Sequence, residues 1–365
     1  MKQLNPAELG KALALFQNSG HQMKLAALAE GGIEGRAWVD AETPGAAIVA
    51  YQNKLMVACQ VPPEQIAGKL RVFLLTEVYQ KRLGGGGDAQ VFWDGEASYQ
   101  ALLMALGDKC PAFTLQEHWE LDHPANAAKA EPPEGYLIVP VEEALLARGL
   151  ENTDRLREEM CSERVSVEEF LRQSFGVCAV KDGALAGWCL SEYNCSKGCE
   201  VGIETVEGHR QKGLARAMVS AFAAEAARRG VARIGWHCFA SNGPSRRTAQ
   251  SAGFDKKLEY GELICCYDPL VQYAVNGNLA DSQGRLEEAA AWYSRACVGE
   301  DAPLWAFVRQ AMTLVSLGRH DDAFASLKSG VANGLDWWDW LDSEPRLAPL
   351  RLDSRWLALM EGANQ

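Results

Sequence analysis

A short basic stretch after an apolar segment contains the residues best suited to bind an anion. Residues 205–218 read TVEGHRQKGLARAM, in which Arg210, Lys212 and Gly213 come just before a run with helical spacing. The first turn of a helix has unpaired backbone N–H groups and a partial positive charge. Glycine lets a ligand approach the backbone closely, and basic side chains add donors. The stretch therefore predicts a site for a phosphorylated ligand.

A nucleotide-binding P-loop does not fit this stretch. Gly208 and Gly213 have the glycine spacing of G-x-x-x-x-G-K-[ST], but Leu214 and Ala215 stand where that motif needs a lysine and a hydroxyl. The stretch instead meets the pattern [RQ]-x-x-G-x-[GA], through Arg210, Gly213 and Ala215.

The segments around the basic stretch are predicted to alternate strands and helices. Apolar, β-branched runs predict strands at 199–206 and 232–239. Helical periodicity predicts a long helix over 213–230. A shorter helix is predicted over 244–253, with proline in its first turn and glycine at its end, and Asn242 lies just before it.

In this order of strand, glycine turn, helix, strand, asparagine and short helix ending in Gly253-Phe254, residues 199–254 resemble the GNAT superfamily of acyl-CoA N-acyltransferases. The resemblance implies a GNAT fold of the α/β (α+β) class, with a mixed central sheet flanked by helices. It also implies acetyl-CoA as the cosubstrate. A looser likeness over residues 35–264 to bacterial members with a degenerate GNAT-like first half predicts a non-catalytic N-terminal lobe.

The resemblance implies roles for individual residues. The backbone at Thr205 and Val206 would hold the acetyl-pantetheine arm, and Asn242, Ser245 and Arg246 would line the other flank of the coenzyme. The residues that would hold the pyrophosphate are Arg210, Gln211, Lys212, Gly213, Leu214, Ala215 and Arg216. Asn242 could instead only cap the short helix. Either Arg246 or Arg247 could contact a phosphate, or both could belong to a solvated face.

Three side chains are candidates for the proton acceptor of an amine acetylation. Glu200 and Glu204 lie four residues apart on one predicted strand and therefore share a face. His237, on the next strand, has a suitable intrinsic pKa. Many family members carry a tyrosine at the position occupied here by Ala249, and that tyrosine protonates the leaving thiolate. Here Tyr193 or Cys238 would donate this proton, or the thiolate would leave without an acid.

The chain divides into three predicted domains: a degenerate GNAT-like lobe (1–130), a catalytic GNAT domain (131–268) and an all-α domain (269–365). In the last, GRLEEAAAWYSRAC and GRHDDAFASLKSGV begin at Gly284 and Gly318, a spacing of 34 residues. They resemble two tetratricopeptide repeats. Because two repeats are too few to stand alone, we expect this block to dock on the second domain or on another subunit.

Charge and cysteine content limit the partners. Lys plus Arg is 36 and Asp plus Glu is 48, which gives a formal charge of −12. This balance argues against nucleic acid, including a charged tRNA substrate, and against an anionic membrane. The start of the chain does not have the pattern of a signal peptide, so we expect a cytoplasmic protein with reduced thiols. No pair of cysteines has a second Cys/His pair at metal-ligand spacing, so no metal is expected.

Two functions follow from these observations. The first is an acetyl-CoA-dependent N-acetyltransferase in which a primary amine (a small amine, an amino acid, an antibiotic or a protein amine) attacks the thioester directly in a ternary complex. The alternative is a catalytically weak acyl-CoA sensor that signals through the repeats. In either case the repeats are expected to bind a protein partner or a second copy of the chain.

Overall fold

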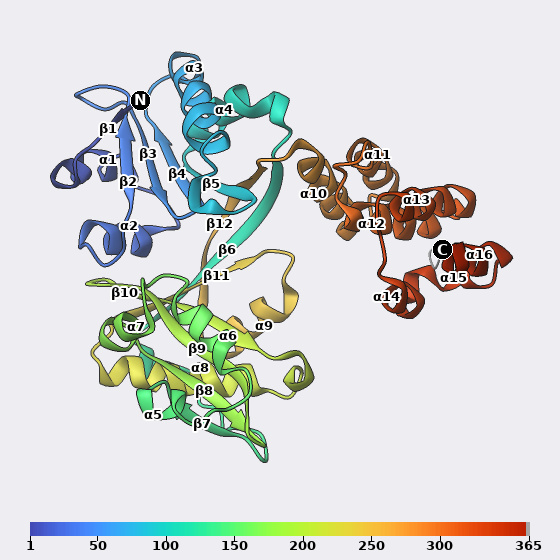
Figure 1. The fold of residues 1–365 in the computed structure, drawn as a ribbon. Helices are drawn as coiled ribbons and strands as arrows, with labels where there is room; N and C mark the ends of the chain where they lie inside the picture. The colour runs from blue at the N-terminus through green and yellow to red at the C-terminus, as the bar shows by residue number, and fades with distance from the viewer. Residues whose placement is uncertain (363–365) are drawn as a thin grey trace.

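A single twelve-stranded sheet runs through two lobes of the computed structural model, which describes residues 1–362 (Figure 1). The strand order is β1-β2-β3-β4-β5-β12-β6-β11-β10-β9-β8-β7. The first lobe contains β1 (Lys2–Gln3), β2 (Arg36–Val39), β3 (Ala46–Tyr51), β4 (Lys54–Cys59) and β5 (Asp88–Asp94). The second contains β7 (Leu137–Pro140), β8 (Gly176–Lys181), β9 (Ala184–Cys195), β10 (Gly198–Thr205) and β11 (Arg233–Phe239).

Two long strands join the lobes. β6 (Ala112–Asp122) and β12 (Asp255–Cys266) pair antiparallel with each other. β6 also pairs with β11 of the second lobe, whereas the end of β12 pairs with β5 of the first. Each lobe therefore receives a strand from the other half of the chain, so a division at residue 130 follows the chain order but not the hydrogen bonding of the sheet.

Helices cover both faces of the first lobe. α1 (Leu9–Leu13) and α2 (Gln22–Ala29) pack on one face of β3 and β4. α3 (Pro63–Phe73) and α4 (Glu96–Leu106) pack on the other. Because β3 and β4 are apolar on both faces, they must be covered on both sides, and their residues are almost all buried.

The second lobe contains the two strands and two helices that the sequence predicted over residues 199–253, namely β10, α8 (Leu214–Arg228), β11 and α9 (Gly243–Ser251), and further elements before them. A two-residue turn at Asp182 and Gly183, both with positive φ, joins β8 to β9. α8 buries its apolar stripe on one face of the sheet. α5 (Glu143–Leu146), α6 (Thr153–Met160) and α7 (Val167–Gln173) lie on the opposite face. α9 follows β11.

The C-terminal block consists of helices and lies beside the two lobes in Figure 1. Its helices are α10 (Pro269–Ser282), α11 (Leu286–Ala296), α12 (Leu304–Ser316), α13 (His320–Ala332), α14 (Trp338–Ser343), α15 (Ala348–Arg351) and α16 (Ser354–Gly362). The side-chain amide of Asn276 donates to the carbonyl of Cys110 at 2.8 Å, next to β6. The block thus docks where β6 begins and β12 ends, so it contacts the last strand of the predicted second domain together with a strand of the predicted first domain.

No helix among residues 1–362 is long and apolar enough to cross a membrane.

Two helical glycines should respond in opposite ways to alanine. A Cβ at Gly277 in α10 would lie 2.7 Å from the ring of the buried Tyr293, whereas a Cβ at Gly68 in α3 would meet nothing within 4 Å. We expect Gly68→Ala to stabilise the protein by up to about 1 kcal/mol through helix propensity. Gly277→Ala should destabilise the helical block by about 1–3 kcal/mol through overpacking. Differential scanning calorimetry of both variants checks this, and stabilisation by both would contradict the packing described.

Candidate active site

A cavity opens where β10 and β11 part. These parallel strands pair only at Cys199–Ile234 and Glu200–Gly235, and beyond Glu200 no residue of β11 pairs with β10. The indole of Trp236 donates to the Ser245 hydroxyl at 3.0 Å and so joins β11 to α9. The resulting cavity, about 940 Å³, lies between the end of β10, the start of α8 and α9. Its size is that of a ligand site.

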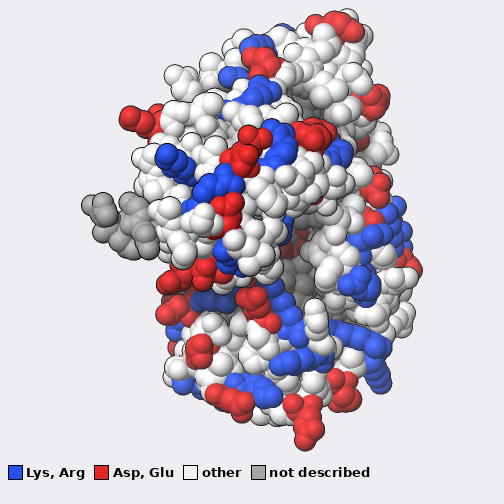
Figure 2. All heavy atoms as spheres, turned by 90° about the vertical axis from the view of Figure 1, so that its right-hand side faces the viewer, with Lys and Arg blue, Asp and Glu red and all other residues white. Residues whose placement is uncertain are grey.

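The N-terminus of α8 points its free amides at this cavity. Gly213 precedes the helix with φ 79°, and a Cβ there would meet no atom within 4 Å. No side chain caps the helix, so its first N–H groups have no partner within it. Exposed Arg210, Arg216 and Arg247 line the cavity. Figure 2 shows Lys and Arg side chains prominent on the face of the second lobe that it presents. The arrangement fits a polyphosphate.

Most residues predicted to bind the coenzyme line this cavity. They are Thr205, Arg210, Gln211, Gly213, Leu214, Ala215, Arg216, Asn242 and Ser245, together with Glu204. Asn242 Oδ1 also accepts a hydrogen bond from the backbone N–H of Ser245 at 3.1 Å. Asn242 therefore caps α9, which was the alternative role predicted for it.

Three predicted residues lie outside the cavity lining. Val206 packs toward the core under α6 and α7. Lys212 folds back, and its ammonium donates to the carbonyl of Gly208 at 2.8 Å. Arg246 points away from the cavity and pairs with the buried Glu117 at 2.9 Å. Its neighbour Arg247 lines the cavity instead, because one residue along a helix turns the side chain by about 100°.

Sequence reasoning missed several other lining residues. They are Ile203, His209, Trp236, Pro244, Thr248 and Ser251. His209 also makes a 2.8 Å hydrogen bond to the Tyr136 hydroxyl. The helical period offered a signal for α9, since residues 244, 247, 248 and 251 lie on one face at spacings of three and four.

Glu200 lies at the centre of a buried network that spans both lobes. One carboxylate oxygen pairs with the ammonium of Lys24 from α2 at 2.9 Å, and the other accepts from His237 Nε2 at 3.0 Å. His237 Nδ1 lies 2.7 Å from the Tyr260 hydroxyl. Both ring nitrogens of His237 and both oxygens of Glu200 are therefore occupied by other side chains.

The same contacts set the charge states. Burial would raise the pKa of Glu200, but His237 and Lys24 outweigh it and hold that pKa well below its usual range. Burial lowers the pKa of His237, against the opposing effect of Glu200. His237 also stacks on His118 at 4.4 Å between ring centroids. The arrangement fits a carboxylate and a neutral imidazole, so neither group has the free lone pair and matched pKa that favour a general base.

Glu204 shares the face of Glu200, as the two-residue period predicted, but its carboxylate is ion-paired with Arg155 of α6. It also lines the cavity. The position of the family's tyrosine acid, Ala249, is fully buried in the core under α8.

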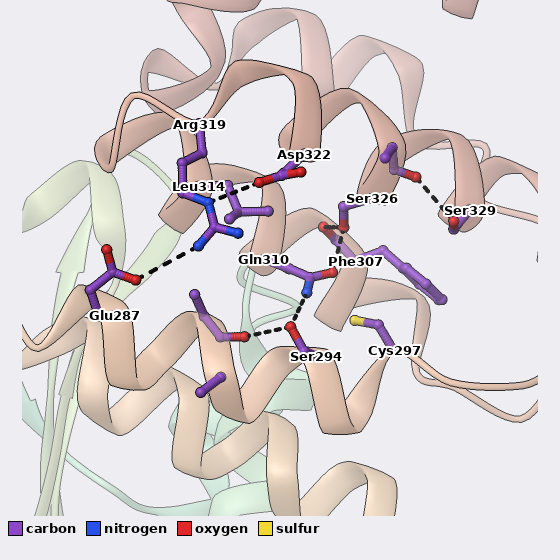
Figure 3. A pocket seen from close by; sticks show the side chains of 13 residues that line it. Glu287, Ser294, Cys297, Phe307, Gln310, Leu314, Arg319, Asp322, Ser326 and Ser329 are labelled. Atoms are coloured by element: carbon purple, nitrogen blue, oxygen red, sulfur yellow. Dashed lines mark hydrogen bonds and ion pairs between the residues drawn. The ribbon is translucent and has the colours of Figure 1, made fainter.

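A second cavity, about 440 Å³, lies between α11, α12 and α13 in the helical block (Figure 3). Its polar groups are largely paired with each other. Ser326 donates to Gln310 at 2.8 Å, and Arg319 pairs with Asp322 at 2.8 Å. Among residues 1–362, no group of three His, Cys, Asp or Glu side chains could hold a metal ion.

Comparison with known proteins assigns the family. A family model described as GNAT acetyltransferase matches residues 13–263, which include both lobes and the parted strands. The chain belongs to the GNAT acetyltransferase family. Membership implies acyl transfer from acyl-CoA and confirms the mixed sheet flanked by helices that the sequence predicted. The match to the family model ends at residue 263, before the helical block.

Solved structures resemble this GNAT acetyltransferase in fold. A GCN5-related N-acetyltransferase-like protein from Streptococcus suis is 18% identical with a TM-score of 0.53, and the match covers 71% of this chain and 99% of that one. A Drosophila protein is 14% identical with a TM-score of 0.50, covering 73% of this chain and 98% of that one. None of the curated proteins compared matches the chain.

The buried ion pair between the lobes should govern stability in a pH-dependent way. Lys24→Met leaves Glu200 buried without its main cation, and we expect a loss of about 3–5 kcal/mol at neutral pH. Because the folded pKa of Glu200 is depressed, the stability from this pair is present above its ordinary pKa and is lost as pH falls below it. The difference in the free energy of unfolding between wild type and Lys24→Met should therefore become smaller as the pH is lowered below about 4.3.

Lys54→Met is the matched control, since Lys54 is a partly buried lysine of the same lobe without an ion pair in the described structure. Urea unfolding of the three proteins from neutral to acid pH gives the comparison. Equal losses in the two variants, or a gap independent of pH, would contradict the role of the pair.

Proposed function

We propose that this GNAT acetyltransferase is an acetyl-CoA-dependent N-acetyltransferase that acetylates a primary amine in a ternary complex. The observation that carries the proposal is the cavity between the parted β10 and β11, which ends at the uncapped N-terminus of α8. One open cleft thus offers strand edges for an extended arm and backbone amides for phosphates. Family membership supports acyl-CoA as the ligand.

The residues of the cavity fit coenzyme A. Gly213 to Arg216 and Arg210 would hold the pyrophosphate, through amides and guanidinium groups. Arg247 and Thr248 of α9 would contact the nucleotide side of the ligand. The strand edge beyond Glu200 would align the pantetheine arm and would bring a thioester near the point where β10 and β11 separate. When bound, the coenzyme supplies an acyl group on a good leaving thiol.

Transfer needs one new bond and one broken bond. The neutral amine nitrogen bonds to the acyl carbon, and the carbon–sulfur bond breaks. Of the two protons that leave the ammonium, one reaches the thiolate and one reaches solvent through a base. The Ala249 position carries no acid, and Cys238 and Tyr193 are buried, with burial raising the pKa of each. A thiol with a pKa near 8.5 leaves without strong assistance.

We also propose that residues 269–365 form a tetratricopeptide-like domain that docks a protein partner or a second copy, and that the protein is cytoplasmic. Two helix hairpins in which Gly277, Ala289, Ala311 and Ala323 pack as small buried residues support the first proposal. Eleven free thiols support the second.

A matched pair at Gly213 tests the cofactor site. Asparagine tolerates the left-handed backbone at φ 79°, and aspartate has nearly the same shape but adds a negative charge beside the phosphates. We expect Gly213→Asp to bind acetyl-CoA at least tenfold more weakly than Gly213→Asn, as measured by isothermal titration calorimetry. Gly208→Asp, at an exposed glycine outside the cavity lining, is the control. Similar affinity for acetyl-CoA in the two Gly213 variants would show that the phosphates of the coenzyme do not bind at Gly213.

Turnover separates an enzyme from an acyl-CoA sensor. We expect purified protein with acetyl-CoA and a panel of primary amines to release free thiol faster than without amine, because the proposed binding mode would leave the thioester open to attack by an amine. The assay uses a thiol reagent, and a product peak in mass spectrometry confirms the acetylated amine. Saturable binding of acetyl-CoA with no amine-dependent release would favour the sensor.

A further inference from the structure

Glu192 of β9 crosses to β10 at the place where β10 parts from β11. It is the direct cross-strand neighbour of Glu200, and both side chains lie on the sheet face opposite α8. Its carboxylate lies over the backbone of Gly202, where an ideal Cβ would fall only 1.9 Å from Glu192 Oε1. Only glycine at 202 leaves room for this carboxylate. Ile203, the next residue, packs on the α8 side of the sheet, whereas Glu204 shares the face of Glu192 and lines the coenzyme cavity. This face of β10 therefore leads from Glu192 to that cavity.

Glu163, from the loop between α6 and α7, approaches the same place. Its Oε2 accepts the backbone N–H of Tyr193 at 2.9 Å, while its Oε1 is buried without any partner. Tyr193 itself has φ 49°, an unusual conformation for a bulky residue. Backbone strain of this kind is concentrated at functional sites. The kink in β9 thus places Glu163 beside Glu192.

Tyr51, on β3 of the first lobe, is the third residue near Glu192 and Glu163. It is only 4% exposed, and its buried hydroxyl has no hydrogen-bond partner. Burial and then Glu163 raise the pKa of Tyr51, the neighbouring Tyr193 side chain opposes them, and Glu192 adds a smaller rise. Because a buried unpaired hydroxyl is costly, a polar group of a ligand beside Tyr51 would be stabilised by a hydrogen bond to it. No hydrogen bond or ion pair of Glu192 occurs among the described residues.

The local charge is suited to a cation. The titratable groups that face Glu192 are Lys24, Tyr51, Lys54, Glu159, Glu163, Tyr193 and Glu200. Of the two lysines, Lys24 is already paired with Glu200. Burial, followed by the other two carboxylates, raises the pKa of Glu192 to about 8. Burial likewise raises the pKa of Glu163 to about 7. Carboxylates in this state gain from a bound ammonium group.

We infer that Glu192, Glu163 and Tyr51 form the binding site for the protonated primary amine of the acceptor substrate, and that Glu192 is the base that removes its proton. This inference rests on the proposed acetyl transfer. It places the acceptor between the lobes, on the face of the sheet opposite α8, with the first lobe supplying one wall. It assigns the base to a residue of β9 in place of Glu200, Glu204 and His237, whose polar atoms are engaged by other side chains.

The proton balance is simple. The ammonium R–NH₃⁺ gives one proton to the Glu192 carboxylate, which becomes a carboxylic acid, and the freed lone pair attacks the acyl carbon. The carbon–sulfur bond breaks, and its electron pair leaves on the sulfur as a thiolate. The second proton of the nitrogen passes to that thiolate, and Glu192 releases its own proton to solvent. Glu163 and the Tyr51 hydroxyl hold the ammonium and do not change covalently.

The test compares Glu192→Gln with Glu158→Gln, an exposed glutamate of α6 that undergoes the same change of charge. Both variants should bind acetyl-CoA as wild type does in calorimetry. With an amine from the panel, Glu192→Gln should lower kcat by about 10²–10⁴-fold, and it should abolish the rise of kcat/KM toward pH 8 that wild type shows. Glu163→Gln should chiefly raise KM for the amine and leave the rise with pH in place.

Stability supplies a readout that does not depend on the identity of the amine. Because Glu192 binds its proton more tightly when folded, its contribution to stability is present below its ordinary pKa and is lost as pH rises toward 8. Glu192→Gln should therefore melt higher than wild type at pH 8.5 and show little difference at pH 5. At pH 8.5, methylammonium chloride should raise the Tm of wild type above that in an equal concentration of sodium chloride, and Glu192→Gln should lose this effect.

The outcomes separate the inference from the proposed function. If wild type does not bind acetyl-CoA, the proposed function fails. If it binds acetyl-CoA, but methylammonium stabilises wild type and Glu192→Gln equally, the ammonium site is wrong. An unchanged pH profile in an active Glu192→Gln variant would overturn the assignment of the base.

Discussion

The parting of β10 from β11 is the constraint on which the rest of the site depends. Two parallel strands that stay paired would leave no free edge, and the helix after β10 would begin against the sheet. Because pairing ends at Glu200 and Gly235, Trp236 and α9 are set apart from β10, and the start of α8 faces open space. The anion cradle, the cleft for an extended arm and the approach to Glu192 all result from this local loss of strand pairing.

The buried pair of Lys24 and Glu200 has a second structural effect. It fixes α2 of the first lobe over the second lobe, in a region that otherwise contains ring stacks and unpaired carboxylates. Charged groups removed from water stabilise a protein only when their partners are well placed. The first lobe therefore acts as more than a cover, since its lysine keeps Glu200 ionised and its Tyr51 reaches toward Glu163.

The sequence predicted the elements from β10 to α9 because their signals are local. Helical periods, a glycine before a helix and a proline in a first turn act over a few residues, and each is present in the structure. Arg246 was chosen over Arg247 because a local pattern does not give the rotation of a short helix against a cleft. Glu192 was missed because its environment comes from Glu163 and Tyr51, which are distant in sequence. Gly202 within a strand was the one local signal of a close approach.

The exchange of β6 and β12 between the lobes determines how the chain can fold during synthesis. β5 pairs with β4 on one edge, but its other edge finds a partner only in the final residues of β12, which leave the ribosome after the rest of the second lobe. Until then the first lobe has an unpaired strand edge, which is a template for aggregation. The helical block follows β12 directly and docks at that same end of the sheet. When the helical block docks, it would cover the part of the sheet that forms last. We therefore expect the two lobes to fold together as one cooperative unit and not one after the other.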